Sequence, residues 1–394
     1  MTPLFSHNTL TKVLKTGIGS TICLIAMTGL KMTEFSTPLT EKLGIEIPIL
    51  LAPMAGGPTT PELVTAVSEG GGFGQFGAAY LDGDAIRDMT KTLKASSNKS
   101  FGINLFIPED PPFTGEQAAA AKEAVRKYFE QFGIPFPETV TNMMPDFEQQ
   151  ILSVIESGIR LCSFHLGLAP QTSISALKRA GVITVASVTS VAEGRQAEKS
   201  GIDFIIAQGS EAGGHRGTWI GKWEDSMTGT MSLVAQLTAN VSTPVIAAGG
   251  IMDGRGMAAA MALGAAGVQM GTAFLSCPEA GVHQQYKKAL LSAKDDTTTV
   301  TETFSGRPAR GLRNRFISEM EKSDAKILPF PLQNQLTSGL RKAAAEAENT
   351  DFMSMWCGQA AALSRGLPAA ELIEMIVTEY SATLDQLAGQ TDRG

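Results

Sequence analysis

One histidine lies in a glycine-rich block where chemistry is expected. His215 belongs to the segment 208–217, Gln-Gly-Ser-Glu-Ala-Gly-Gly-His-Arg-Gly, which directly follows the apolar run Phe204 to Ala207. An imidazole exchanges a proton near neutral pH, and the surrounding glycines leave the ring accessible. We therefore interpret His215 as an acid–base catalyst rather than as a structural histidine.

The other histidines and the neighbouring arginine are weaker candidates. His165 follows another apolar run and would support a neighbouring group, whereas His283 is expected in a surface helix and His7 lies near the N-terminus. Arg216 is expected to be a solvated surface residue, although its charge would also suit an anionic substrate.

Two glycine turns further along the chain predict an anion site. Gly249-Gly250 and Gly271-Thr272 each end a short aliphatic run. Glycines expose backbone N–H groups, and such turns bind phosphate when they follow the last two strands of an α/β barrel. We therefore expect a phosphate group there.

A third glycine pattern, Gly72-x-Gly74-x-x-Gly77, has the spacing of a dinucleotide-binding loop but not its context. That fingerprint follows a strand and precedes a helix. Here a helix is expected before the glycines, which fall within an apolar strand. We interpret them as close-packing positions.

These residues must be positioned by repeated βα units. From Ile47 onward, short aliphatic runs alternate with amphipathic stretches, which is typical of parallel strands joined by helices. Eight strands favour an α/β fold of the (β/α)8 TIM-barrel type over an open doubly wound sheet. The expected strands are Ile47 to Ala52, Phe73 to Gly77, Phe101 to Phe106, Leu161 to Phe164, Val182 to Ala186, Phe204 to Ala207, Pro244 to Ala247 and Gly267 to Met270. The expected helices include Pro61 to Glu69, Ala85 to Lys94, Asp146 to Ser157, Ser173 to Arg179, Val191 to Lys199 and Gly256 to Leu263.

Two connections, 108–144 and 210–231, are longer than the others, and long connections in compact domains are usually functional. Beyond the eighth strand, the stretches 336–347 and 367–384 have helical patterns. We expect this tail to fold over the barrel mouth. The predicted organisation is a leader (1–36), a TIM-barrel domain (37–303) and a C-terminal helical segment (304–394).

Composition excludes several classes of function. The 39 acidic residues outnumber the 32 basic ones, and the net charge of -7 argues against nucleic acid as a partner. The four cysteines form no CxxC pair, so we expect neither a disulfide scaffold nor a metal site, and we favour a cytoplasmic location.

The apolar run Ile18 to Leu30 is too short to span a bilayer, so no stable membrane association is expected. It resembles the core of a secretory signal but lacks a clear cleavage site, and Met32 offers a second start. We favour a disordered or misassigned leader over an export signal.

Five short motifs follow one another on successive expected strands. They are 49–56 (Ile-Leu-Leu-Ala-Pro-Met-Ala-Gly), 104–106 (Asn-Leu-Phe), 208–217, 247–250 (Ala-Ala-Gly-Gly) and 269–272 (Gln-Met-Gly-Thr). In this order they resemble the nitronate monooxygenases, once called 2-nitropropane dioxygenases. The resemblance extends over about 43–384.

The resemblance implies FMN as the cofactor, bound by the barrel domain at the carboxyl ends of its strands, with His215 as the catalytic base. Asn104 and Gln208 would hydrogen-bond the flavin ring or ribityl chain, and Gly213 would allow close backbone approach. Met54 would pack under the flavin or serve as a plain hydrophobic residue. The implied phosphate-binding residues are Gly250, Gln269, Met270, Gly271 and Thr272.

The implied reaction is the oxidation of an alkyl nitronate by O2 to a carbonyl compound and nitrite. His215 would deprotonate a neutral nitroalkane, and its protonated form would stabilise the resulting anion. A homo-oligomer is compatible with the sequence.

Two other activities suit the same barrel. Flavin-dependent enoyl-acyl-carrier-protein reductases share the Glu-Ala-Gly-Gly-His block, and an NADH:quinone reductase would use the same scaffold. The tail segments 329–333 and 352–360 resemble the monooxygenase branch and favour nitronate oxidation. Cys357 in the second segment is not interpreted as a nucleophile, because nothing indicates an electropositive setting. A non-catalytic flavin-binding protein is disfavoured because it has no need of a histidine beside the flavin.

Overall fold

The computed structural model describes residues 35–323 and 325–391. Most of the expected leader, 1–34, therefore lies outside the described residues. The first described helix, α1 (Pro38–Leu43), is capped by the side chain of Thr37, which accepts a hydrogen bond from the backbone N–H of Thr40. No described helix is long and apolar enough to cross a membrane.

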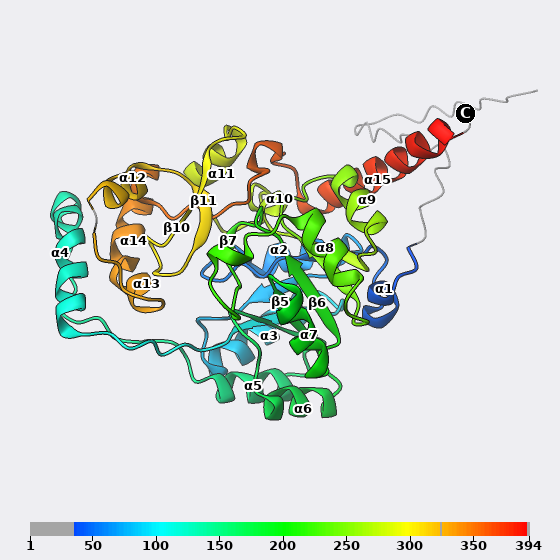
Figure 1. Ribbon diagram of the computed structural model, residues 1–394, viewed down its shortest axis with the longest axis horizontal. Coiled ribbons are helices and arrows are strands. Elements are labelled where there is room, and N and C mark those ends of the chain that lie inside the picture. Colours follow the sequence, from blue (N-terminus) through cyan, green and yellow to red (C-terminus); the bar gives the residue numbers. More distant parts are fainter. Residues whose placement is uncertain (1–34, 324, 392–394) are drawn as a thin grey trace, which may run out of the picture. The chain divides into compact units, whose positions relative to one another are not determined.

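Eight parallel strands form the barrel that the sequence predicts (Figure 1). They are β1 (Ile49–Leu51), β2 (Gln75–Gly77), β3 (Gly102–Phe106), β4 (Leu161–His165), β5 (Ile183–Val188), β6 (Phe204–Gln208), β8 (Val245–Ala248) and β9 (Gly267–Met270). Their order is β1-β9-β8-β6-β5-β4-β3-β2. A parallel bridge between Leu50 and Phe73 joins the two end strands, so the barrel closes.

The six predicted helices are confirmed, and α8 is added between β6 and β8. The barrel helices are α2 (Pro61–Glu69), α3 (Gly83–Ser96), α5 (Phe147–Glu156), α6 (Gln171–Arg179), α7 (Val191–Lys199), α8 (Thr230–Thr238) and α9 (Gly254–Ala262). Side-chain caps begin several of them; Asp82, for example, accepts a hydrogen bond from the backbone N–H of Ala85 at the start of α3.

Alternation along the strands produces two apolar layers. Residues such as Leu50, Phe73 and Ile246 form one cluster together with Leu39 of α1, whereas their strand neighbours pack against the surrounding helices. The glycines of the GxGxxG spacing serve packing, as expected. A Cβ atom on Gly74 would lie 2.3 Å from the backbone oxygen of Val64 in α2.

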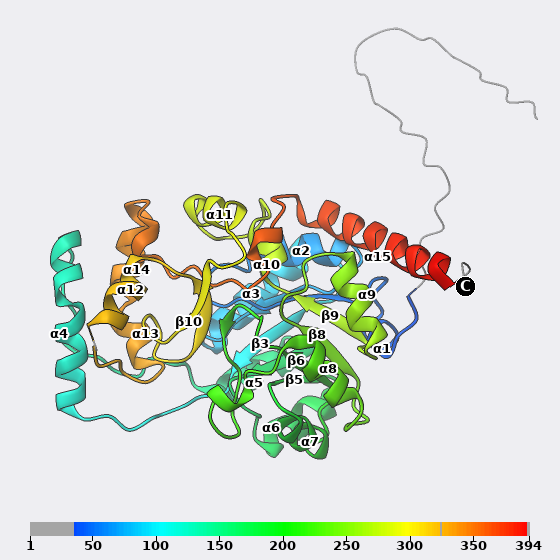
Figure 2. The same cartoon turned by 45° about the horizontal axis from the view of Figure 1, so that its top comes forward.

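A second apolar core lies outside the barrel. The connection 108–144 contains α4 (Gly115–Phe132), a helix that we did not expect, and Figures 1 and 2 both place it beside the helices of the tail. The rings of Tyr128 and Phe316 lie 5.0 Å apart, in a cluster that also includes Leu340 and Phe352. The tail helices here are α12 (Arg315–Lys322), α13 (Leu332–Leu336) and α14 (Ser338–Glu346).

The tail also contains strands and a helix that returns to the barrel. Strands β10 (Thr298–Thr301) and β11 (Ala309–Leu312) form an antiparallel sheet with β7 (Gly214–His215), which belongs to the glycine-rich block 208–217. The last helix, α15 (Ala369–Thr391), packs against α9 and α2 (Figures 1 and 2). The remaining elements are α10 (Thr272–Leu275), α11 (Gln284–Leu291), and the 3-10 turns Glu224–Ser226, Thr350–Phe352 and Ala361–Leu363.

Candidate active site

A cavity of about 560 Å³ lies at the carboxyl ends of the barrel strands, under the tail. Seven of the nine predicted site residues line it, namely Asn104, Gln208, Gly213, His215, Gln269, Gly271 and Thr272. Residues of the tail, including Asn334, Arg341 and Trp356, complete the lining. No aspartate or glutamate of the described chain lines this cavity.

His215 is held through its backbone from three directions. His215 pairs with Ala309 of β11 in the antiparallel sheet, so the tail contributes to the placement of His215. Its carbonyl oxygen accepts hydrogen bonds from Nε2 of His165 at 3.0 Å and from Nε2 of Gln208 at 2.9 Å. Oε1 of Gln208 accepts a further bond from the backbone N–H of Gly217 at 2.7 Å. Gln208 therefore clamps both ends of the segment that presents the imidazole.

The imidazole of His215 packs among aromatic rings and stays neutral. Its centroid lies 5.3 Å from that of Phe330, 6.0 Å from Trp356 and 6.1 Å from Phe106. Neither ring nitrogen has a hydrogen-bond partner among the described residues, and Nε2 is enclosed while Nδ1 is not. Burial, followed by electrostatic interactions with His165 and two arginines, lowers the pKa of His215 to about 3.

His165 is also neutral. Burial and the charges of Arg307 and Arg216 lower its pKa to about 4, against the opposing hydrogen bond to His215. Because a carbonyl oxygen only accepts, Nε2 of His165 carries the proton in this bond. The expectation that His165 supports a neighbouring group is confirmed.

The expectation that Arg216 is a solvated surface residue is wrong. Only 6% of Arg216 is exposed, and its guanidinium donates to the backbone oxygens of Gln208 and Ser226. Its backbone N–H donates to Pro308 of the tail at 2.7 Å. Arg216 does not line the cavity, so it fixes the loop rather than contacting a substrate there.

The amide side chains of Asn104 and Gln269 line the barrel side of the cavity, and Gln75 lies beside Gln269. Nδ2 of Asn104 donates to the backbone oxygen and hydroxyl of Ser163, and Oδ1 of Asn104 bonds no described residue. Oε1 of Gln269 accepts a bond from Nε2 of Gln75 at 3.1 Å, and Oε1 of Gln75 is buried without a partner. Gln75 was missed because an isolated amide inside an apolar strand gives no local signal.

The two glycines of the turn after β8 differ in their relation to the cavity. Gly249 (φ +113°) lines it, whereas Gly250 (φ +73°) does not, and a Cβ atom on Gly250 would lie 3.2 Å from Cβ of Glu211. Met270 is 1% exposed and belongs to the apolar core, so it does not line the cavity either. The amino end of α9 already receives the carboxylates of Asp253 and Glu379.

The tail closes on the barrel at Gly213. A Cβ atom there would lie 2.4 Å from the backbone carbon of Cys357, so this glycine permits close approach of the tail. Oγ1 of Thr272 accepts a hydrogen bond from the backbone N–H of Gly358 at 2.8 Å. Burial raises the pKa of Cys357 to about 12, so its thiol stays protonated near neutral pH.

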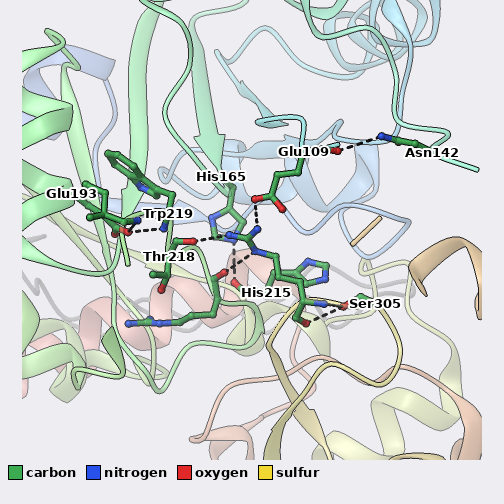
Figure 3. Close-up of polar contacts among 11 residues, drawn as sticks. Glu109, Asn142, His165, Glu193, His215, Thr218, Trp219 and Ser305 are labelled. Carbon is green, nitrogen blue, oxygen red and sulfur yellow. Dashed lines mark hydrogen bonds and ion pairs between the residues drawn. The ribbon is translucent and has the colours of Figure 1, made fainter. Parts of the chain in front are cut away.

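Arg307, a residue without a predicted role, joins three segments around His215. Its guanidinium pairs with Glu109 and donates to the backbone oxygens of Thr218, at 2.7 Å, and Arg216, at 3.3 Å. Figure 3 shows Glu109 and Thr218 beside the two histidines. No local sequence pattern around Arg307 indicates these partners.

The remaining missed residues come mainly from the tail. Phe330, Trp356 and Arg341 meet the barrel only in the tertiary structure. His283 was expected on a surface helix but caps α11 and lines the cavity. No group of described His, Cys, Asp and Glu side chains has the arrangement of a metal site.

Comparisons with known proteins agree with one another. The family model described as nitronate monooxygenase matches residues 36–379. A probable nitronate monooxygenase of Staphylococcus saprophyticus is 41% identical over 355 residues, which cover 90% of this chain and 100% of that protein. A probable nitronate monooxygenase of Staphylococcus aureus is 41% identical over 344 residues, which cover 87% of this chain and 97% of that protein.

Two solved structures share the fold and the sequence pattern. Nitroalkane oxidase from Streptomyces ansochromogenes has a TM-score of 0.82 and 35% identity, covering 89% of this chain and 100% of that chain. FabK from Thermotoga maritima has a TM-score of 0.72 and 32% identity, and the match covers 90% of this chain and 99% of that chain. With a family match over most of its length, the chain belongs to the nitronate monooxygenase family of oxidoreductases.

Proposed function

We propose that this oxidoreductase is an FMN-dependent nitronate monooxygenase. It would oxidise alkyl nitronates, and nitroalkanes after deprotonation, with O2 to carbonyl compounds and nitrite. The observation that carries the proposal is the state of His215. Its imidazole is neutral, and neither ring nitrogen has a hydrogen-bond partner among the described residues. No carboxylate of the described residues lines the cavity around it. Such an imidazole accepts a proton from a substrate carbon and does not repel the anion that forms.

The residues present suit a flavin. The cavity of about 560 Å³ has the size of ordinary cofactor sites, roughly 300–1,000 Å³. A side chain at position 271 would crowd the cavity wall, because a Cβ atom on Gly271 would lie 3.2 Å from Cβ of Ala52 and 3.6 Å from Sδ of Met54. The amide oxygen of Asn104 is available to a ligand donor.

Asn104, Gln208 and Gln269 would face the ring or ribityl chain, with Met54 beneath the ring. The backbone around Gly250, Gly271 and Thr272 would hold the phosphate, and Met270 and Gly213 would support these turns from behind. The carboxylates at the start of α9 favour a phosphate held by the turns over one placed on that helix. When bound, FMN supplies the redox capacity that couples substrate oxidation to reduction of O2.

The chain itself would handle the proton. Nδ1 of His215, the ring nitrogen that neighbouring side chains leave accessible, would take the α-proton of a nitroalkane. A pKa of about 3 makes the free imidazole a weak base. The anion formed beside it would raise that pKa, because an opposite charge stabilises the imidazolium. Gln208 and His165 would keep the ring oriented through the His215 carbonyl.

The test is anaerobic mixing of the purified yellow protein with ethyl nitronate and, in a separate syringe, with NADH. We expect nitronate to bleach the flavin absorbance rapidly and O2 to restore it with release of nitrite. An inert flavin with nitronate, or recovery of FAD instead of FMN, contradicts the proposal.

A reductase is the alternative, which the likeness to FabK favours as a specific observation. Rapid bleaching by NADH, followed by reoxidation with an enoyl thioester or a quinone, would support that activity instead. In that case the tail residues around His215, which complete the cavity, are the ones to compare with those of FabK.

A further inference from the structure

Arg341 is a cation without a carboxylate partner at the cavity wall. It lies on α14, and only its Nη2 is bonded, to the backbone oxygen of Asn334 at 2.6 Å and to Oδ1 of the same residue at 2.9 Å. Its Nε is buried without a partner, and Nη1 donates to no described residue. Asn334 therefore orients the guanidinium without neutralising it.

Arg341 is the one lysine or arginine among the described residues that line this cavity, and no described carboxylate lines it. The two other arginines near His215 are used differently. Arg307 pairs with Glu109, and Arg216, which does not line the cavity, donates to the backbone oxygens of Gln208 and Ser226. Arg307 thus has a carboxylate partner and Arg216 lies outside the lining, whereas Arg341 faces the cavity without a carboxylate partner.

Keeping such a cation in a partly buried site has a cost. Removing a guanidinium from water without a counter-ion is unfavourable, and an anionic ligand offsets that cost. Burial lowers the pKa of Arg341, but a guanidinium keeps its charge in proteins. The phenol of Tyr80, which also lines the cavity, has a pKa raised to about 12 and is no counter-charge at neutral pH.

We propose that Arg341 binds the negatively charged oxygen atoms of the substrate's nitronate group and makes the enzyme favour anionic over neutral substrates. The inference deepens the proposed function and rests on it for the identity of the substrate. A planar guanidinium matches a pair of oxygen atoms on one nitrogen, as it matches a carboxylate. Arg341 would also stabilise the anion that His215 creates from a neutral nitroalkane.

The test compares Arg341→Gln with Lys342→Gln. Lys342 is the next residue of α14, lies 3.9 Å from Glu346 and is 80% exposed, so its variant loses the same charge on the solvent side. In Arg341→Gln we expect KM for ethyl nitronate to rise at least about tenfold, the loss for one charge-assisted hydrogen bond. KM for neutral nitroethane should change much less. Lys342→Gln should match the unmodified enzyme, and Arg341→Lys should recover part of the loss.

Nitrate supplies a readout without turnover. This planar, unreactive anion should raise the Tm of the flavin-loaded and flavin-free protein, and of Lys342→Gln, but not of Arg341→Gln. Equal losses on nitronate and nitroethane, or equal nitrate stabilisation in both variants, overturn the inference. If the unmodified enzyme oxidises no nitronate but nitrate stabilisation still depends on Arg341, the anion site stands and the proposed function fails.

Discussion

His215 shows how one residue acquires its chemistry from its surroundings. Aromatic rings enclose it, its backbone is clamped by Gln208 and His165, and its pKa is lowered to about 3. These features suit a proton acceptor that is neutral until an anion forms beside it. The same features make its contribution separable, because a preformed nitronate has no α-proton to transfer.

We expect His215→Asn to lose about 10²-fold or more in turnover of neutral nitroethane, the usual scale for a positioned acid–base group. Turnover of ethyl nitronate should fall much less. Initial rates with both substrates, normalised to flavin content, measure the difference. Equal losses would assign His215 to anion binding or flavin tuning, and no loss on either substrate would return it to a structural role.

At the scale of elements, the loops after β3 and β6 are joined by a residue of the tail. Arg307 links Glu109, Arg216 and Thr218. Figure 3 shows Glu193 beside Trp219, and Glu193 accepts the backbone N–H groups of Trp219 and Ile220. The loop that carries His215 is therefore held along its length by side chains from other elements.

Arg307 should also influence the pH profile. After burial and His165, its charge lowers the pKa of His215, so with nitroethane we expect no loss of kcat/KM in the unmodified enzyme as pH falls from 7 to 5. Arg307→Gln removes that charge and raises the pKa, so activity should begin to fall at a higher pH. Glu109→Gln breaks the same ion pair but keeps the cation, and its profile should show no upward shift. Equal shifts in both variants would indicate a loss of structure instead.

The turn after β8 offers a test of cofactor binding. Gly250 has φ +73°, and its Cβ atom would lie 3.2 Å from Cβ of Glu211. Gly264 has φ +91° but precedes β9, at the other end of the barrel. An alanine at either position should cost about 1–2 kcal/mol in backbone strain.

We expect only Gly250→Ala to lower FMN retention, because the turn would hold the phosphate. Flavin content after gel filtration and the Kd of added FMN measure this, with Gly264→Ala as the control for strain. Unchanged FMN affinity in a folded Gly250→Ala protein would remove this turn from the site.

At the scale of the whole molecule, the tail both completes the cavity and returns to the barrel. α15 packs on α9, and Oε2 of Glu379 accepts the backbone N–H of Gly254 at 3.0 Å. Ile376 is fully buried in the main core cluster. The last helix therefore contributes to the same core as the barrel helices.

Ile376→Ala should lower the free energy of unfolding by about 2–5 kcal/mol, as for other large-to-small core substitutions. Met375→Ala changes a neighbouring side chain that is 39% exposed, and it should stay within about 0.5 kcal/mol. Urea unfolding of the flavin-free protein, followed by circular dichroism, compares them. If Ile376→Ala and Met375→Ala had the same free energy of unfolding, α15 would not be part of the cooperative barrel core.

The local pattern of the sequence determined the barrel. Each strand is a short apolar run, each predicted barrel helix is amphipathic, and glycine turns mark where strands end, so the sequence alone predicts that His215 follows a barrel strand. Because these signals are local, most of the residues that the sequence predicts for the site do line the cavity. Gly250 and Met270 do not line the cavity, and strand position alone does not say which side chain or turn faces it.

Only the tertiary structure decided what covers the barrel. The burial of Arg216, the ion pair of Arg307 with Glu109, and the exposure of Arg341 to the cavity all depend on segments far apart in the chain. A charged residue has the same local appearance whether it faces water, a backbone oxygen or a ligand. Its surroundings are fixed by which remote surfaces bury their apolar faces together, as α4 and the tail helices do in the second core.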